Sequence, residues 1–466
     1  MGKKFYITTA IPYVNARPHV GHALEYVIAD AIHRYREIVG SEVRLVSGAD
    51  ENALKNVQAA ERAGVSIQEF LDKNSKIFEE FYKLLGVKLD EFRRGSDQNL
   101  HWPGVIKLWE LVEKNGDLYK KKYKGLYCVG CESFKTEKEL VDGKCPEHDR
   151  VPEVVEEENY FFKLGKYQDL LLKLIESDEY KIVPEKRKNE ALAFLKGGLE
   201  DFSVSRSNER AKGVGVPVPN DPKQRAYVWF DALTIYMTAS GYGYDEALWD
   251  TWWPADLHII GKDIFRFHSL YWPAMLLSAG LPLPKELLVH GFITSGGRKM
   301  SKTIGNVVDP YEIIEKYGVE PLRYFLLSQI PTLDDGDFTE ERFKEVYNAD
   351  LANGLGNLVL RVKGLGQKSK VLGAKAKLKF SKEVANAFGS YQLNQALDAI
   401  WKRIKKVDIL INENEAWNLK GSKKEDLLKT LNAEIRQIAY DLRPFLPETA
   451  DKIEGQTEGA LFPRLD

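Results

Sequence analysis

The chain has 466 residues, of which 44% are hydrophobic and 29% are charged, which is typical of a globular protein of about three domains. Its 67 Lys and Arg residues nearly balance its 69 Asp and Glu residues. Any nucleic acid would therefore have to bind at local basic patches, because the net charge of the whole chain provides no attraction. No run of about eighteen apolar residues and no signal peptide occur, and three cysteines are too few for a secreted disulfide framework. These features exclude a membrane span and predict a reducing, cytoplasmic location.

The N-terminal region alternates between strand and helix patterns. Phe5–Thr9 is an apolar strand, and a periodic helix is expected from Gly21 to Val39. A second strand follows at Val43–Ser47, and another helix is expected after Asp50. Strand, helix and strand in this order predict a βαβ unit with a parallel sheet, that is, a Rossmann-type α/β domain.

This pattern stops near Leu118 and returns near Ala226. The intervening segment holds all three cysteines and is interpreted as an insertion. Strands are then expected at Ala226–Trp229, Leu257–Ile260 and Leu287–Val289, as the second half of the same fold. From Glu340 onward the periodicity predicts an α-helical bundle with a linker near Lys363–Lys379. The expected domains are residues 1–117, 118–224, 225–339 and 340–466.

The motif His19-Val20-Gly21-His22 lies where the first strand gives way to a helix. A helix N-terminus at that edge of a parallel sheet offers free N–H groups to a phosphate, and two imidazoles can donate further hydrogen bonds. Two surface histidines at a helix cap are the alternative.

A second motif, Lys299-Met300-Ser301-Lys302-Thr303, follows the glycine pair Gly296-Gly297. A glycine-flanked loop with lysines three residues apart can close over a triphosphate and neutralise its charge. Alone it would be interpreted as a solvated basic loop. The two motifs together, in this order, are far more specific.

The two motifs resemble the signatures of class I aminoacyl-tRNA synthetases. Four further segments are similar to the methionyl-tRNA synthetase family in particular, so the resemblance covers nearly the whole chain: Ile11-Pro12-Tyr13-Val14-Asn15, Tyr227-Val228-Trp229-Phe230-Asp231-Ala232, Gly261-Lys262-Asp263-Ile264 and Asn348-Ala349-Asp350-Leu351-Ala352-Asn353. The chain departs from a common family pattern at Asn52-Ala53, where His-Gly is usual.

The resemblance implies a reaction in two steps, in which methionine and ATP form methionyl-adenylate and the acyl group then passes to tRNA(Met), initiator and elongator. It implies Mg²⁺ with the ATP. It assigns phosphate stabilisation to His19, His22, Lys299 and Lys302, and further ATP contacts to Gly21, Gly261, Asp263 and Ser301.

The methionine pocket can be interpreted physically as well. Trp229, Ala232, Leu233 and Tyr236 share one helical face, and Ile264 and His268 are four residues apart on another. Such stripes more often form a core, but the resemblance places them, with Ile11 and Tyr13, in the pocket. A thioether favours aromatic walls. The ammonium group of the methionine substrate needs a carboxylate from Asp50 or Glu51, and the sequence does not choose between these two residues.

A metal site is predicted inside the insertion. Cys128 and Cys131 form one pair of ligands, and Cys145 and His148 form a second pair after thirteen intervening residues. Three thiolates and one imidazole make a standard tetrahedral zinc set without an open position, so the zinc is expected to be structural. The alternative is four unrelated residues in a polar insertion.

The helical region carries basic segments. Residues 361–379 hold seven basic residues and no acidic one, and a second basic face is expected at residues 401–406. A solvated face is the usual explanation of such runs. The resemblance places Asn353, Asn357 and Trp417 at anticodon-reading positions, where Asn can bind base edges and Trp can stack on a base. For Trp417 a core position is an equal alternative.

Three alternative functions agree less well with the sequence. Synthetases for Ile, Val or Leu need a large editing domain, and the 276 residues between His22 and Lys299 are too few for one. A cysteinyl enzyme would carry a zinc-binding cysteine in its cleft. A tRNA-binding protein without activity would have lost phosphate-contacting residues, which are present here. The chain ends soon after the last helix, so we expect a monomer that binds neither DNA nor membranes.

Overall fold

The computed structural model describes residues 2–131, 133–135, 137–146, 149–300, 306–366, 378–455 and 459–465. The chain divides into two compact units: residues 1–18, 41–83 and 88–289 form the first, and residues 19–40, 84–87 and 290–466 form the second. The first unit is built on a six-stranded sheet in the order β3-β2-β1-β12-β13-β7. Its strands are β1 (Lys4–Thr9), β2 (Glu42–Ala49), β3 (Glu91–Arg94), β7 (Lys181–Val183), β12 (Leu257–Gly261) and β13 (Glu286–His290).

The parallel sheet predicted from the sequence is confirmed. β1 pairs in parallel with β2 and β12, β2 with β3, and β13 with β7. The helices and helical turns of this unit are α2 (Leu54–Ala63), α3 (Ile67–Leu84), α4 (Trp102–Lys114), η1 (Glu137–Glu139), η2 (Leu164–Tyr167), α5 (Gln168–Glu176), α6 (Glu185–Lys196), α7 (Val228–Thr238), α8 (Glu246–Trp252), η3 (Lys262–Ile264), η4 (Phe267–Tyr271) and α9 (Trp272–Ser278).

Within residues 118–224 a long antiparallel pair, β4 (Leu118–Cys128) and β6 (Glu153–Phe162), is flanked by short strands. These are β5 (Ser133–Lys135), β8 (Phe202–Ser203), β9 (Ser205–Ser207), β10 (Pro217–Val218) and β11 (Asp221–Ala226). The same segment contributes helices α5 and α6 and returns β7 to the main sheet beside β13. Pairing between such distant segments has no local signal in the sequence.

One predicted strand is wrong. Residues 226–229 were expected to be extended, but β11 ends at Ala226 and helix α7 begins at Val228. Every residue of α7 is buried, so its apolar run carries no amphipathic period that would distinguish a buried helix from a buried strand.

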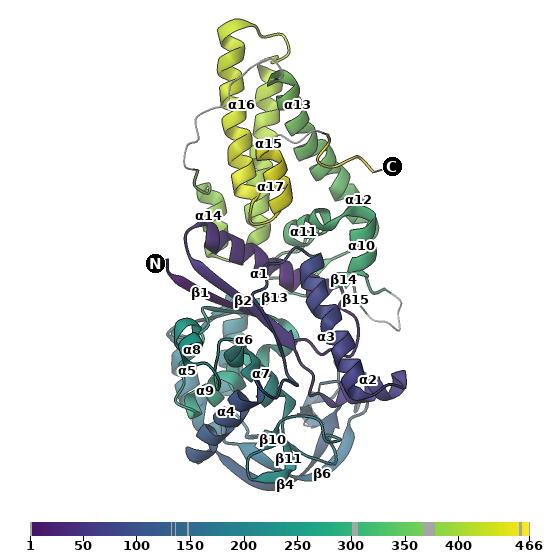
Figure 1. The fold of residues 1–466 in the computed structure, drawn as a ribbon, viewed down its shortest axis with the longest axis vertical. Coiled ribbons are helices and arrows are strands. Elements are labelled where there is room, and N and C mark those ends of the chain that lie inside the picture. Colours follow the sequence, from purple (N-terminus) through teal and green to yellow (C-terminus); the bar gives the residue numbers. More distant parts are fainter. Residues whose placement is uncertain are drawn as a thin grey trace. The chain divides into compact units, whose positions relative to one another are not determined.

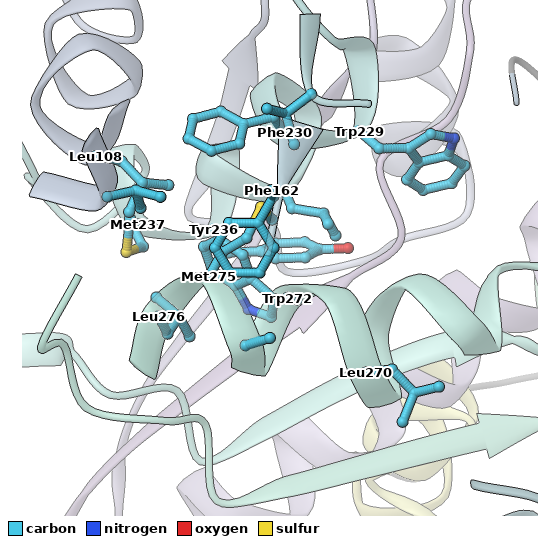
Figure 2. Packing of buried hydrophobic residues seen from close by; sticks show 14 of the residues in the cluster. Leu108, Phe162, Trp229, Phe230, Tyr236, Met237, Leu270, Trp272, Met275 and Leu276 are labelled. Atoms are coloured by element: carbon cyan, nitrogen blue, oxygen red, sulfur yellow. The ribbon is translucent and has the colours of Figure 1, made fainter. Parts of the chain in front are cut away.

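Helix α7 packs into the main hydrophobic core of the first unit. Figure 2 shows the side chains of Trp229 and Phe230 leaving the start of α7 in opposite directions, and Tyr236 lying close to Trp272 of α9. Phe230 and Trp272 are fully buried, and the Trp109 and Phe230 rings meet edge to face at 5.4 Å between centroids. This packing fixes the helix that carries four of the predicted pocket residues.

The second unit contains α1 (Val20–Ile38) together with the elements that follow β13, and α13, α15 and α16 lie side by side in it (Figure 1). These elements are β14 (Ile293–Ser295), β15 (Arg298–Lys299), α10 (Pro310–Tyr317), α11 (Val319–Ser328), β16 (Gly336–Asp337), α12 (Glu340–Val346), η5 (Tyr347–Gly356), α13 (Asn357–Gly366), α14 (Lys382–Gly389), α15 (Leu393–Glu413), α16 (Gly421–Leu442) and α17 (Pro447–Glu454). The helical region expected from Glu340 is confirmed. The expected linker at 363–379 begins later than predicted, because α13 continues to Gly366, and residues 367–377 of it lie outside the described residues.

A buried arginine joins α1 to the helices of this unit. Arg323 of α11 donates to the Asp30 carboxylate of α1 at 2.6 Å, to Leu85 O at 3.1 Å and to Phe445 O at 2.9 Å. Asp30 is fully buried and also accepts from Arg34 at 2.7 Å. At the C-terminal end of α1, the Tyr35 ring stacks on Phe388 of α14 at 4.0 Å between centroids. These contacts fix α1 within the second unit.

Among the described residues, no helix is both long enough and apolar enough to cross a membrane.

Candidate active site and metal centre

The first signature motif forms the N-terminal cap of α1. The extended residue His19 accepts the Gly21 N–H on its Nδ1 at 3.1 Å, and His22 Nδ1 accepts the His19 N–H at 3.1 Å. The two ring centroids lie 4.0 Å apart, and a Cβ on residue 21 would lie 2.8 Å from His19 Cε1, so a larger residue would require the His19 ring to shift. This is a reciprocal capping box built from two imidazoles.

The cap sets the tautomers of both histidines. A neutral imidazole has one N–H, so an Nδ1 that accepts a hydrogen bond leaves the proton on Nε2. Burial lowers the pKa of His22 well below its usual value, and the neighbouring His19 lowers it further. The motif therefore presents neutral Nε2–H donors at the positive end of a helix.

The second signature motif begins in a hairpin. β14 and β15 pair antiparallel around Gly296 and Gly297, whose positive φ angles of 61° and 72° suit a two-residue turn. Partial burial raises the pKa of Asp337. Hydrogen bonds from Thr294 and the turn amides outweigh this effect and hold the pKa of Asp337 below its usual value. Lys299 is the last residue of β15, while Ser301, Lys302 and Thr303 lie outside the described residues.

An aromatic wall is assembled in the first unit from three segments. The Trp229 ring of α7 stacks on Phe267 at 3.8 Å between centroids, and Tyr13, after β1, meets Trp229 edge to face at 6.2 Å. Phe267 was not among the predicted pocket residues. Its position one residue before His268 was the only signal that could have identified it.

Tyr236 of α7 and His268, which directly follows Phe267 in sequence, form a buried hydrogen-bonded pair. His268 Nδ1 lies 3.0 Å from Ile264 O, a carbonyl that can only accept, so His268 Nε2 accepts from the Tyr236 hydroxyl at 2.8 Å. Burial lowers the pKa of His268 to about 4, so the ring is neutral at physiological pH. The structure thus brings these predicted residues together.

The two candidate carboxylates, Asp50 and Glu51, have different surroundings. Glu51 Oε1 accepts from Ser75 Oγ and from Arg94 Nε at 2.8 Å, and Glu51 Oε2 accepts from the backbone and the hydroxyl of Ser96. Four hydrogen bonds therefore hold Glu51 within the protein. Asp50 instead forms a β-bridge with Tyr13 of the aromatic wall.

The departure from the family pattern at Asn52 has a structural role. Asn52 Nδ2 donates to Asp231 Oδ2 at 2.5 Å and to Gly95 O at 2.9 Å. Asp231 Oδ1 also meets His101 Nε2 at 2.6 Å, deep in the core. The asparagine thus ties the segment after β2 to helix α7.

The other residues predicted to bind methionine or ATP lie in two places, the hydrophobic core around α7 and the end of β12. Ala232 and Leu233 are buried in α7, and Ile11 lies partly buried against the same core. Gly261 ends β12, and Asp263 and Ile264 lie in the η3 turn that follows.

Three predicted metal ligands converge. The Sγ atoms of Cys128, Cys131 and Cys145 all lie within 4.8 Å of one another, and those of Cys131 and Cys145 are 3.5 Å apart. Three sulfur atoms at this spacing fit a tetrahedral thiophilic metal such as zinc. The fourth predicted ligand, His148, lies outside the described residues.

The predicted anticodon residues are exposed. Trp417 is 57% exposed beyond α15, so its alternative core position is wrong, and Asn353 and Asn357 are exposed one helical turn apart. The basic face expected at residues 401–406 is partly neutralised, because Lys402 pairs with Asp398 and Arg403 with Glu434. Arg361 likewise pairs with Asp408.

The family model described as tRNA synthetases class I (M) matches residues 5–150 and 148–363. The chain belongs to this family. It is 41% identical to the methionine–tRNA ligase of Thermotoga maritima, over 97% of this chain and 74% of the relative, and 41% identical to that of Clostridium acetobutylicum, over 97% and 73%.

Solved structures agree with this assignment. The Mycobacterium tuberculosis methionyl-tRNA synthetase in complex with methionyl-adenylate is 38% identical, with a TM-score of 0.90 over 97% of this chain and 93% of that one. The apo form of the same enzyme is 33% identical, with a TM-score of 0.84, covering 100% and 99%. The predicted fold class and family are confirmed.

Proposed function

We propose that this chain is a methionine–tRNA ligase: it activates L-methionine with ATP and transfers the methionyl group to tRNA(Met), initiator and elongator. The observation that carries the proposal is the aromatic wall of Tyr13, Trp229 and Phe267 beside the Tyr236–His268 pair, which suits an unbranched thioether. The methionine–tRNA ligases at 41% identity and the methionyl-adenylate complex at 38% identity support it.

The reaction needs positioning and charge stabilisation more than a nucleophilic side chain. A methionine carboxylate oxygen attacks the α-phosphorus of ATP and pyrophosphate leaves; a tRNA ribose hydroxyl then attacks the acyl carbon and AMP leaves. His19 and His22 donate Nε2–H hydrogen bonds to phosphate oxygens as negative charge develops, and the Lys299–Lys302 loop neutralises the triphosphate. Further ATP contacts come from Gly21, Gly261, Asp263 and Ser301, and Mg²⁺ accompanies the nucleotide.

Within the pocket, each group of the substrate has a partner of suitable chemistry. The thioether packs on the aromatic wall with Ile11, Ala232, Leu233 and Ile264 around it, and its sulfur lies beside the Tyr236 hydroxyl. The ammonium pairs with Asp50, because Glu51 is already held by four hydrogen bonds from the protein.

Methionine-dependent exchange of pyrophosphate into ATP tests the proposal directly. We expect exchange with methionine and with no other amino acid, and a loss of at least about a hundredfold in Lys302→Ala, because that lysine would clamp the transition state. Exchange with another amino acid would overturn the specificity. No exchange with any amino acid, from folded protein, would favour a tRNA-binding protein without activity.

Removing the Tyr236 hydroxyl should raise the KM for methionine. Tyr236→Phe removes the hydroxyl that we place beside the sulfur and leaves His268 Nε2 without its donor; a loss of about 1–3 kcal/mol in binding corresponds to about a 5- to 150-fold change. The KM for ATP should change less than twofold. An equal rise in both constants would place Tyr236 in general folding and not in the pocket.

We assign zinc to the cysteine cluster, with His148 as the fourth ligand, and expect one structural zinc per chain. The purified protein should contain about one equivalent of zinc by elemental analysis, and Cys128→Ser should lose it, because three remaining ligands bind zinc far more weakly. His148→Ala should also retain less than half an equivalent after dialysis. Full retention in His148→Ala would remove that residue from the ligand set.

We assign anticodon recognition to Asn353, Asn357 and the exposed Trp417, on which a splayed base can stack. Comparing the KM for tRNA of wild type and Trp417→Ala, with exchange as the control, tests this assignment. We further propose that the protein is a monomer acting in the cytoplasm, where ATP and tRNA are supplied, and a dimeric mass in solution would contradict the first of these.

A further inference from the structure

Lys55, near the start of α2, contacts both the turn between Cys128 and Cys131 and the aromatic wall. Its Nζ donates to Gly130 O at 3.2 Å, and Gly130 lies in the turn between Cys128 and Cys131. The same Nζ lies 3.0 Å from the centroid of the Tyr13 ring, a cation–π contact. One ammonium group therefore joins the candidate metal turn to a wall of the candidate substrate pocket.

A displacement of the Tyr13 ring would also displace the other two rings of the aromatic wall, Trp229 and Phe267. Tyr13 meets Trp229 edge to face, and Trp229 in turn stacks on Phe267 at 3.8 Å. Trp229 is only 8% exposed, so it has little space in which to adjust independently. In a close-packed interior such a chain of rings shifts together.

Two further contacts join the cysteine-bearing segment, residues 127–145, to elements of the pocket. Arg266, between Ile264 and His268 in sequence, pairs with Glu139 Oε1 at 3.2 Å. The buried Arg206 guanidinium lies 5.3 Å from the Tyr127 ring, next to Cys128, and 4.1 Å from the Tyr227 ring, at the N-cap of α7. These contacts join the segment to the elements that carry the pocket, and Lys55 adds a contact with the metal turn itself.

We infer that Lys55 is a positioning residue that makes methionine affinity depend on metal occupancy of the cysteine cluster. The inference rests on the proposed methionine pocket. A metal held by Cys128 and Cys131 fixes the turn between them and therefore the direction of the Gly130 carbonyl. That carbonyl holds the Lys55 ammonium against Tyr13, and Tyr13 is held in the position that completes the aromatic wall. Without the metal the turn loses its cross-link, and this support is lost.

The test measures methionine binding alone, without ATP or tRNA, by intrinsic tryptophan fluorescence, to which Trp229 of the aromatic wall contributes. Each protein is measured with one equivalent of Zn²⁺ and after removal of the metal by a chelator, with zinc content and the far-ultraviolet circular dichroism spectrum recorded in parallel. The variants are Lys55→Met, which keeps the aliphatic stem, and Lys55→Arg, which can still donate to Gly130 O and cover the Tyr13 ring. Lys107→Met is the matched control, because Lys107 makes a cation–π contact with Tyr242 at 5.0 Å and, within the described part of the chain, contacts Tyr242 and Glu246 and not the cysteine cluster.

We expect zinc removal to weaken methionine binding about tenfold in the wild type and in Lys107→Met. Zinc-loaded Lys55→Met should bind methionine about three- to tenfold more weakly than wild type. Removing the zinc from this variant should then change its affinity for methionine less than twofold. Lys55→Arg should recover most of the wild-type dependence. Lys55→Leu, which likewise has no donor for Gly130 O, provides the same comparison if Lys55→Met does not fold.

Equal effects of zinc removal in wild type and Lys55→Met would overturn the inference, because the metal would then act by another route. Unchanged methionine affinity in zinc-loaded Lys55→Met would also overturn it. A wild-type protein that binds no methionine in either metal state would instead refute the proposed function.

Discussion

Replacing His22 with alanine should lower the kcat of methionine-dependent ATP–pyrophosphate exchange by a factor of about 10²–10³, while the zinc content and the helical spectrum stay unchanged. His22 is neutral, because burial lowers its pKa, and its Nδ1 is engaged by the His19 N–H. We therefore assign the contact with a phosphate oxygen to the Nε2–H of His22. Losing one such donor from a preorganised site has an effect of this size in acyl-transfer enzymes.

Two conservative variants separate the phosphate contact from the helix cap. The amide nitrogen of a glutamine overlays the Nε2 position of the imidazole, whereas an asparagine oxygen can replace only Nδ1. We therefore expect His22→Gln to recover part of the activity and His22→Asn to recover the cap, worth about 1 kcal/mol of stability, without the activity. Recovery of activity in His22→Asn alone would show that His22 acts through the cap.

Replacing Arg323 with methionine should destabilise the second unit by about 3–5 kcal/mol. Arg323 is 1% exposed and donates to the Asp30 carboxylate and to backbone carbonyls at Leu85 and Phe445. Removing the guanidinium breaks a buried ion pair, leaves Arg34 as the remaining arginine partner of Asp30, and takes the donor from two buried carbonyls; breaking a buried pair is strongly destabilising. Urea unfolding followed by circular dichroism should show a lower midpoint for the transition that reports this unit.

Arg342→Met is the matched control for this variant. Arg342 pairs with Glu345 at 3.2 Å, and the two side chains are 56% and 68% exposed. An exposed pair of this kind contributes about 0–1 kcal/mol, so the unfolding midpoint should stay close to that of the wild type. Similar shifts in both variants would show that burial of Arg323 does not govern its contribution.

The positions of the signature helix and most strands were predictable because each has a local pattern. Helix α1 covers Val20–Ile38 where Gly21–Val39 was expected, and β1, β2, β12 and β13 match their predicted segments within two residues. The start of α7 was missed, since residues 226–230 form an apolar run that periodicity alone does not resolve into helix or strand.

Pairwise contacts of side chains were not predictable from spacing. The sequence presented Asp50 and Glu51 as equivalent carboxylates, and only the contacts of Glu51 with Ser75, Arg94 and Ser96 distinguish them. Trp417 carried no signal that chose between a core and a surface position, and its exposure follows from where α15 ends. Phe267 joined the pocket through a ring stack with a helix that precedes it by about thirty residues.

The sequence by itself determined the local chemistry of this protein: two imidazoles at a helix start, lysines beside a glycine turn, and cysteines at ligand spacing, because these patterns depend on residues close together in the chain. The tertiary structure alone decided the long-range pairings. It placed β7 beside β13, brought Lys55 between Gly130 and Tyr13, and grouped α1 with the C-terminal helices through Asp30 and Arg323. The physical reason is that such contacts join segments tens to hundreds of residues apart, and the packing and hydrogen bonding that select them leave no period or motif in either segment.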